Sequence, residues 1–100
     1  MADRPYLYQS AIAVEKSHQL SMSIIRKELN TLGFENGSSP TAWEQLGVNS
    51  DTLVVLTCVP LSASRTYIHV TATSNNEASS KHWHAEVKDR IENSKMVLMG

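Results

Sequence analysis

The segment Thr52–Thr73, TLVVLTCVPLSASRTYIHVTAT, decides the fold of this chain. Its first part, Thr52–Val59, is rich in β-branched residues and apolar at both alternating sets of positions, which is typical of a central strand covered on at least one side. Pro60 is expected to end this strand. Thr66–Thr73 then alternates apolar and polar residues. Because the two strands are so close in sequence, we expect them to pair antiparallel.

The alternation in the second strand divides its side chains between two faces of a sheet. The row expected to face the core is Ile68, Val70 and Ala72. The row expected to face away from it is Tyr67, His69, Thr71 and Thr73. An antiparallel sheet tolerates water on one face, so the second row predicts a solvated or recognition surface.

A helix is predicted from His18 to Leu32. Its apolar stripe recurs every three or four residues, at Met22, Ile25, Leu29 and Leu32. Ser17 precedes the stripe as a good N-cap. Gly33 follows it directly and can supply the left-handed C-cap, with Phe34 folding back on the last turn.

Two interpretations of the residues before Ser17 remain open. Tyr6, Tyr8, Ile12 and Val14 alternate as in a strand, which favours a first strand near Tyr6 to Val14. Ala11 and Val14 would equally continue the helical stripe through His18, which gives one long N-terminal helix. The capping position of Ser17 favours the strand.

Residues 34–52 contain many helix and strand breakers and predict a loop insertion. Ser39 and Pro40 resemble an N-cap and a first-turn proline, so a helical turn is expected up to Leu46, ending at Gly47. Trp43 and Leu46 are then expected to anchor the insertion to the core.

A second helix is predicted after the second β-rich run. Ser74-Asn75-Asn76-Glu77 fits a capping box, and the helix should extend to about Asn93. Trp83, Val87 and Ile91 form the stripe expected to meet the sheet. Lys95 to Met99 would add a short edge strand.

These elements predict one α+β domain over residues 1–100. The order β-α-β-β-α-β resembles the ferredoxin-like split βαβ sandwich, with an antiparallel four-stranded sheet, two helices on one face and an insertion at 34–52. The alternative is an α-β-β-α arrangement that begins with one long N-terminal helix.

Composition narrows the classes of function. Nine Lys and Arg residues against ten Asp and Glu give a net charge of -1, without the basic patch on which nucleic-acid binding depends. No apolar run approaches the length that spans a bilayer, and the start of the chain does not read as a signal peptide. A single cysteine, Cys58, excludes an intrachain disulfide. We therefore expect a cytoplasmic protein with no membrane or nucleic-acid partner.

The stretch Lys81–Glu86, KHWHAE, suggests metal or acid–base chemistry but does not support it. His82 and His84 project about 200° apart on a helix and cannot share one metal ion. His82 shares a flank with Glu86 and Asp89, which leaves a weak alternative of metal binding through His82 and Glu86. We expect a solvated polar face there, and neither a metal nor a cofactor.

The remaining reactive side chains do not form a recognisable catalytic motif. His18 lies on the apolar stripe and is interpreted as a core-edge histidine whose polar tip is hydrogen-bonded. Cys58 is expected to be a buried, unreactive thiol. Because no nucleophile elbow and no phosphate-binding glycine loop is found, an enzymatic role is uncertain and a non-enzymatic one is favoured.

The first functional hypothesis is a small binding or protein-interaction module that self-associates through the open sheet face. That face would carry Tyr67, His69 and Thr71, together with Val55 and Thr57, or Leu56, of the neighbouring strand. The expected partner is a second copy or another protein.

The alternative is a small ligand-binding protein or enzyme with a pocket between the sheet and the 34–52 insertion. The residues expected to line that pocket are Trp43, Tyr67, His69 and either His18 or Cys58.

Overall fold

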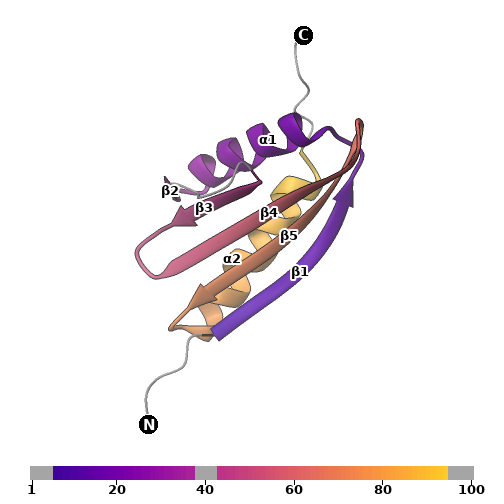
Figure 1. The fold of residues 1–100 in the computed structure, drawn as a ribbon. Helices are drawn as coiled ribbons and strands as arrows, with labels where there is room; N and C mark the ends of the chain where they lie inside the picture. The colour runs from indigo at the N-terminus through magenta and orange to yellow at the C-terminus, as the bar shows by residue number, and fades with distance from the viewer. Residues whose placement is uncertain (1–5, 38–42, 95–100) are drawn as a thin grey trace.

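The protein is described by a computed structural model over residues 6–37 and 43–94. The elements are β1 (Tyr6–Val14), α1 (His18–Thr31), β2 (Glu35–Gly37), β3 (Glu44–Val48), β4 (Thr52–Ser62), β5 (Arg65–Ser74) and α2 (Glu77–Glu92). The strands form a five-stranded sheet in the order β1-β5-β4-β3-β2, and every neighbouring pair is antiparallel (Figure 1). The predicted α+β class is confirmed.

The pairing of β4 with β5 lies at the centre of this sheet. Thr57 is opposite His69, and Val55 is opposite Thr71. The alternate positions of the two strands are fully buried on the other face: Val54, Leu56, Cys58, Ile68, Val70 and Ala72. The predicted antiparallel pairing and the division of β5 into two rows are confirmed.

The prediction that Pro60 ends β4 is wrong. The strand continues to Ser62, with a shift of register between Pro60 and Ser62. Proline has no N–H to donate to the ladder, so strands accept it at such irregular positions.

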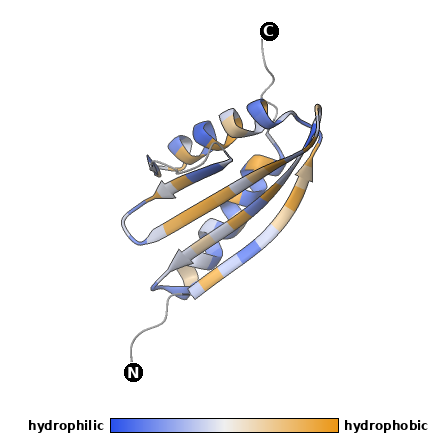
Figure 2. Ribbon diagram, viewed as in Figure 1, coloured by the Kyte–Doolittle hydropathy of each residue, from blue (hydrophilic) through white to orange (hydrophobic). Residues whose placement is uncertain are grey.

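Both helices lie on the same face of the sheet (Figure 1). α1 covers β2, β3 and β4, whereas α2 covers β1 and β5, and the two helices touch each other. Figure 2 shows β4 as the most continuously hydrophobic strand, consistent with its central place. Neither described helix lies over the opposite face, and we call it the open face.

The boundary between β1 and α1 falls where the strand interpretation places it. Ser17 has an extended backbone, and its Oγ accepts a hydrogen bond from the Leu20 N–H at 3.1 Å. The alternative of one long N-terminal helix is wrong. Ser17 is the N-cap of α1, and Tyr6–Val14 before it pair with β5, so these residues form a strand.

The end of α1 follows the predicted glycine cap. Gly33 has a φ of 88°, and its N–H donates to the Asn30 carbonyl at 3.1 Å. The Phe34 N–H donates to the Leu29 carbonyl at 2.8 Å, which completes a Schellman motif. Phe34 is buried and closes the core beneath this end of the helix.

α2 begins two residues later than the predicted capping box implies. Asn76 is the N-cap and accepts a hydrogen bond from the Ser79 N–H, whereas the Ser74 hydroxyl accepts one from the Asn76 N–H. Val87 and Ile91 are buried as expected. Trp83 is partly buried, with its ring edge-on to Phe34 at 5.0 Å between centroids.

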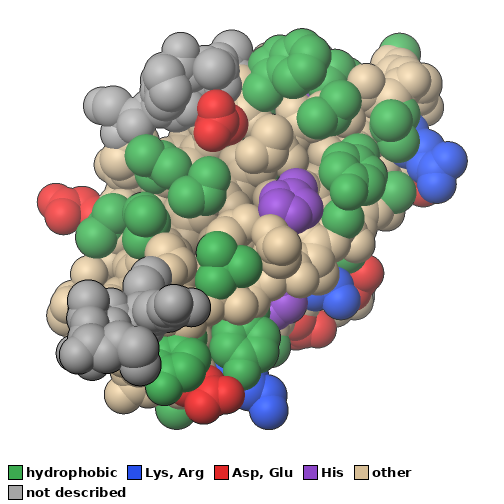
Figure 3. Space-filling model, turned by 60° about the horizontal axis from the view of Figure 1, so that its bottom comes forward, with side chains coloured by type: hydrophobic (Ala, Val, Ile, Leu, Met, Phe, Trp, Pro, Cys, Tyr) green, Lys and Arg blue, Asp and Glu red, His purple; other side chains and the backbone are tan. Residues whose placement is uncertain are grey.

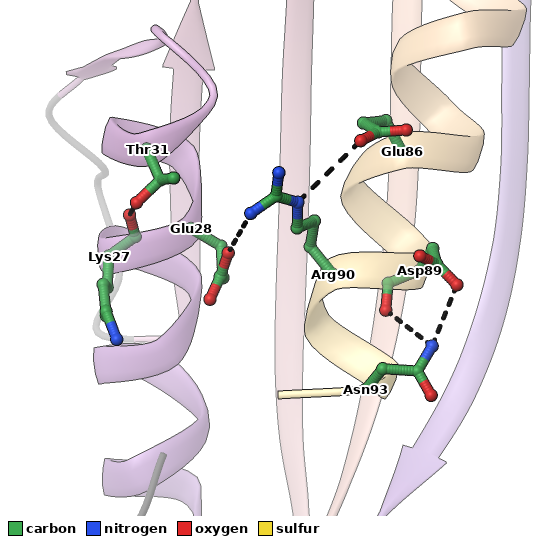
Figure 4. Close-up of polar contacts among 7 residues, drawn as sticks. All are labelled: Lys27, Glu28, Thr31, Glu86, Asp89, Arg90 and Asn93. Atoms are coloured by element: carbon green, nitrogen blue, oxygen red, sulfur yellow. Dashed lines mark hydrogen bonds and ion pairs between the residues drawn. The ribbon is translucent and has the colours of Figure 1, made fainter. Parts of the chain in front are cut away.

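The two helices are also linked by charged side chains (Figure 4). Arg90 of α2 lies 3.6 Å from a carboxylate oxygen of Glu28 on α1 and 3.8 Å from one of Glu86 on its own helix. Because Arg90 is substantially exposed, solvent screens these pairs and they orient the helices more than they stabilise them.

The predicted four-stranded, ferredoxin-like sheet is not confirmed. Residues assigned to a loop insertion instead form β2 and β3, which extend the sheet beyond β4. The helical turn expected up to Leu46 is wrong, since Glu44–Val48 is a strand. Ser39 and Pro40, and the edge strand expected at Lys95–Met99, lie outside the described residues.

Hydrophobic alternation does not predict β3, because the side chains that face the helices are not apolar. Gln45 is buried, and its amide nitrogen donates to the Gly37 and Leu46 carbonyls at 3.2 and 3.1 Å. At Gly47, a Cβ would lie 3.0 Å from a Val54 methyl and 3.1 Å from a Leu29 methyl. A glutamine and a glycine give no hydrophobic alternation.

No helix in the described parts of the chain is long and apolar enough to cross a bilayer.

Trp83→Ala should lower the free energy of unfolding by about 2 to 3 kcal/mol, because it removes the ring that packs on Phe34 and the core. Urea denaturation would measure this. Trp43→Ala is the matched control, since Trp43 is 48% exposed and the substitution should cost about 1 kcal/mol or less. Equal losses in the two variants would show that Trp83 does not contribute to the core.

Candidate functional site

The open face is formed by alternate residues of adjacent strands. His69 of β5 lies near its middle, opposite Ala11 of β1 on one side and Thr57 of β4 on the other. The next row on one side joins Thr71 to Val55, and the next on the other side joins Tyr67 to Val59. Five predicted site residues, Tyr67, His69, Thr71, Val55 and Thr57, therefore lie together on this face.

Several large apolar side chains on this side of the sheet are exposed. Tyr67 of β5 is 40% exposed, and Leu7 of β1 is 54% exposed. Val48 and Leu53 are exposed as well, in one row across β3 and β4. Figure 3 shows groups of hydrophobic side chains around a histidine, with most charged side chains toward the margins of the surface.

Charged residues are almost absent from the long strands. β1, β4 and β5 contain a single Lys, Arg, Asp or Glu residue, Arg65, which pairs with Glu15 at 3.2 Å beyond the end of β1. Glu44 and Glu35 carry the acidic charge at the β3 and β2 side of the face. The His69 ring has its closest polar contact with the Thr71 hydroxyl, at 3.5 Å from Nδ1.

The residues expected to line a pocket are not brought together. Trp43 precedes β3, and its ring lies edge-on to His18 at 6.3 Å, near the start of α1. Cys58 and Leu56 are buried on the helix face, whereas Tyr67 and His69 lie on the open face. The described part of residues 34–52 continues the sheet and does not cover it. The prediction that Trp43 and Leu46 anchor this segment to the core is wrong, because neither residue belongs to the buried core.

Cys58 is a buried thiol, as expected. Desolvation raises its pKa to about 12, so the reactive thiolate is scarce at neutral pH.

Native Cys58 should resist an aromatic disulfide reagent at neutral pH and react fully once urea unfolds the chain, because burial withholds both access and the thiolate. Absorbance of the released thiol measures this. Rapid reaction of the native protein would contradict the burial of Cys58.

The alternative of a metal site at His82 and Glu86 lacks a third ligand among the described residues. His82 rests edge-on against Trp83 at 4.7 Å, and Glu86 faces Arg90. Asp89 accepts a hydrogen bond from the Asn93 amide at 2.9 Å (Figure 4). Over residues 6–37 and 43–94, no group of three or more His, Cys, Asp and Glu side chains is arranged to hold a metal ion.

His18 lies at the edge of the core, where the sequence placed it. Its Nε2 atom is buried and has no hydrogen-bond partner within the described ranges, so the expected satisfied tip is not found there. The aromatic neighbour of the His18 ring is the ring of Trp43.

His84 joins α2 to the sheet, a contact that the sequence analysis missed. Its Nε2 lies 2.8 Å from the Ser10 hydroxyl on β1, and its ring is 6.3 Å from that of Tyr8. Tyr8 in turn donates to Glu77 at 3.1 Å. Burial, and secondarily the charge of Lys88, lower the pKa of His84. No sequence pattern reveals this contact, because it depends on which strand lies beside α2.

A surface hollow next to His84 is formed by residues of α2 alone: His84, Ala85, Glu86, Lys88, Asp89 and Glu92. Ligand sites bury most of their ligand between several elements. A hollow with one helix as its wall does not meet that requirement.

No protein-family model matches the chain, and no curated protein matches it. Its function must therefore be inferred from its own residues and geometry.

Acid should destabilise the wild type more than the His84→Gln variant. The lowered pKa of folded His84 means that the unfolded chain binds the proton more readily. The stability that His84 contributes is present above the ordinary histidine value of about 6.5 and is lost as the pH falls below it. Urea unfolding at about pH 7.5 and about pH 5.5 would measure the difference.

The matched control is His82→Gln, which changes an exposed histidine on the same helix and leaves His84 in place. Because His84 is intact in this variant, it should keep the loss of stability in acid that His84 causes. An equal acid response in the His84→Gln variant would show that the contact with Ser10 does not depend on the neutral imidazole.

Proposed function

We propose that the protein is a small binding module that self-associates through the open face of its sheet. The observation that carries the proposal is the open face of β1, β4 and β5, over which no described helix lies. It exposes Leu7, Leu53 and Tyr67, and its strands contain a single charged residue, Arg65. Large apolar side chains gathered on one exposed face are a feature of protein-interaction sites.

The size of the face suits a second copy. Strands spaced about 4.8 Å apart that rise about 3.3 Å per residue give the whole five-stranded sheet, β2 and β3 included, a projected area on the order of 600 Å². Stable interfaces bury about 800 Å² per partner, and side chains add to the projected area. A face-to-face contact would therefore reach the range of stable dimers.

Packing of two such faces follows known sheet geometry. Two sheets stack about 10 Å apart with their strands at about -30°, and side chains of the two inner faces interdigitate. The middle of the face, at His69 and Thr57, would then meet the same region of the second copy, because a two-fold contact is self-complementary.

The proposed module is cytoplasmic. A lone buried cysteine, with no disulfide in the described chain, suits a reducing compartment. A fractionation experiment with the tagged protein tests this location directly.

Val55→Lys should weaken self-association at least about tenfold, because a lysine in the middle of the face would be buried without a partner. Sedimentation equilibrium over a wide concentration range measures the dissociation constant. Gln19→Lys is the matched control, since it adds the same charge at an exposed position on α1, and it should associate as the wild type does.

A wild-type protein that stays monomeric at high micromolar concentration would overturn the proposal. So would a dimer whose dissociation constant is the same in Val55→Lys and Gln19→Lys.

A further inference from the structure

The two edges of the sheet are built differently. The β2 edge has three residues and includes Glu35. The β1 edge has nine residues, Tyr6–Val14, and it pairs with β5 along its whole length without a register shift. Half of the backbone groups of an edge strand point away from its neighbour, so β1 presents a long row of unpaired donors and acceptors.

Proteins usually protect such an edge with a charge, a proline, a bulge or a short strand. β1 has none of these, because its sequence YLYQSAIAV contains no charged residue and no proline. Within residues 6–37 and 43–94, none of the backbone hydrogen bonds outside helices and strands involves β1. The side chains of Tyr8 and Ser10 bond to α2 and leave the outer edge of β1 uncovered by that helix.

α2 covers one face of β1 and not its edge. Ile12 and Val14 are buried toward the helices, whereas Leu7, Ala11 and Ala13 are exposed on the open face. Figure 1 shows β1 as the outermost strand, with α2 behind the sheet.

We propose that β1 pairs antiparallel with β1 of a second copy and joins two sheets into one continuous sheet. A two-fold axis near Ser10, the middle residue of the strand, would set Tyr8 beside Ile12 of the second copy, an aromatic and β-branched pair of the kind that stabilises sheets. An uncharged strand meets its own copy without like-charge repulsion and has no charge pattern to select another partner.

This contact rests on the edge strand and is independent of the proposed open-face contact. Antiparallel pairing of two edges uses an axis perpendicular to the sheet, whereas stacking of two faces uses an axis within its plane. The two contacts therefore do not compete for the same surface.

Amide hydrogen exchange along β1, measured over a range of protein concentrations, tests the proposal. The experiment uses the full-length Val55→Lys chain, in which the open-face contact is weakened. The alternate β1 amides that point away from β5 should become protected as concentration rises, in step with dimer formation in sedimentation.

Tyr6→Lys combined with Tyr8→Lys, in the same background, should shift that protection to at least about tenfold higher concentration. Both side chains lie on the helix side of β1, so they leave the open face unchanged, and a lysine at 8 can still pair with Glu77. The matched control is Gln19→Lys with Ala63→Lys, two exposed positions outside β1, which should leave the protection unchanged.

Two results would overturn the inference. Outward β1 amides that exchange freely at every concentration would mean that nothing pairs with the edge. Protection that does not change with concentration would mean that the chain's own residues cover it. Either result leaves the open-face proposal intact, because that proposal is judged by the wild type against Val55→Lys.

Discussion

The antiparallel pairing of β4 with β5 is the constraint on which the rest of the structure depends. It sorts alternate side chains to two sides, so that Val54, Leu56 and Ile68 meet the helices while Val55, Thr57 and His69 meet solvent. A shift of one residue would exchange the two sets and bury the histidine. The core and the candidate interaction surface are therefore two results of one register.

The sequence predicted the ends of α1, which depend on neighbouring residues alone. Ser17 marked the start of α1 and Gly33 its end, because capping needs only neighbouring residues. β3 could not be predicted in this way. Its inward residues, Gln45 and Gly47, are acceptable only because Gln45 bonds to nearby carbonyls and α1 approaches Gly47 closely, and both conditions come from the folded structure.

The candidate site was predictable to the same extent. The row of Tyr67, His69 and Thr71 followed from alternation alone, and the structure places it on the open face. The expected neighbour Trp43 lies elsewhere, because the segment around it became a strand and not a cover. The edge position of β1 required knowledge of strand order, which no short-range pattern contains.

The pairing of β1 with β5 affects the order in which the strands fold. Tyr6 pairs with Ser74, 68 positions later in the chain, whereas β4 and β5 are joined by a turn at Ala63 and Ser64. Closing a long loop costs more entropy than closing a short one, and distant contacts slow folding. The β4–β5 hairpin can therefore form early as a template, and β1 is among the last strands to pair.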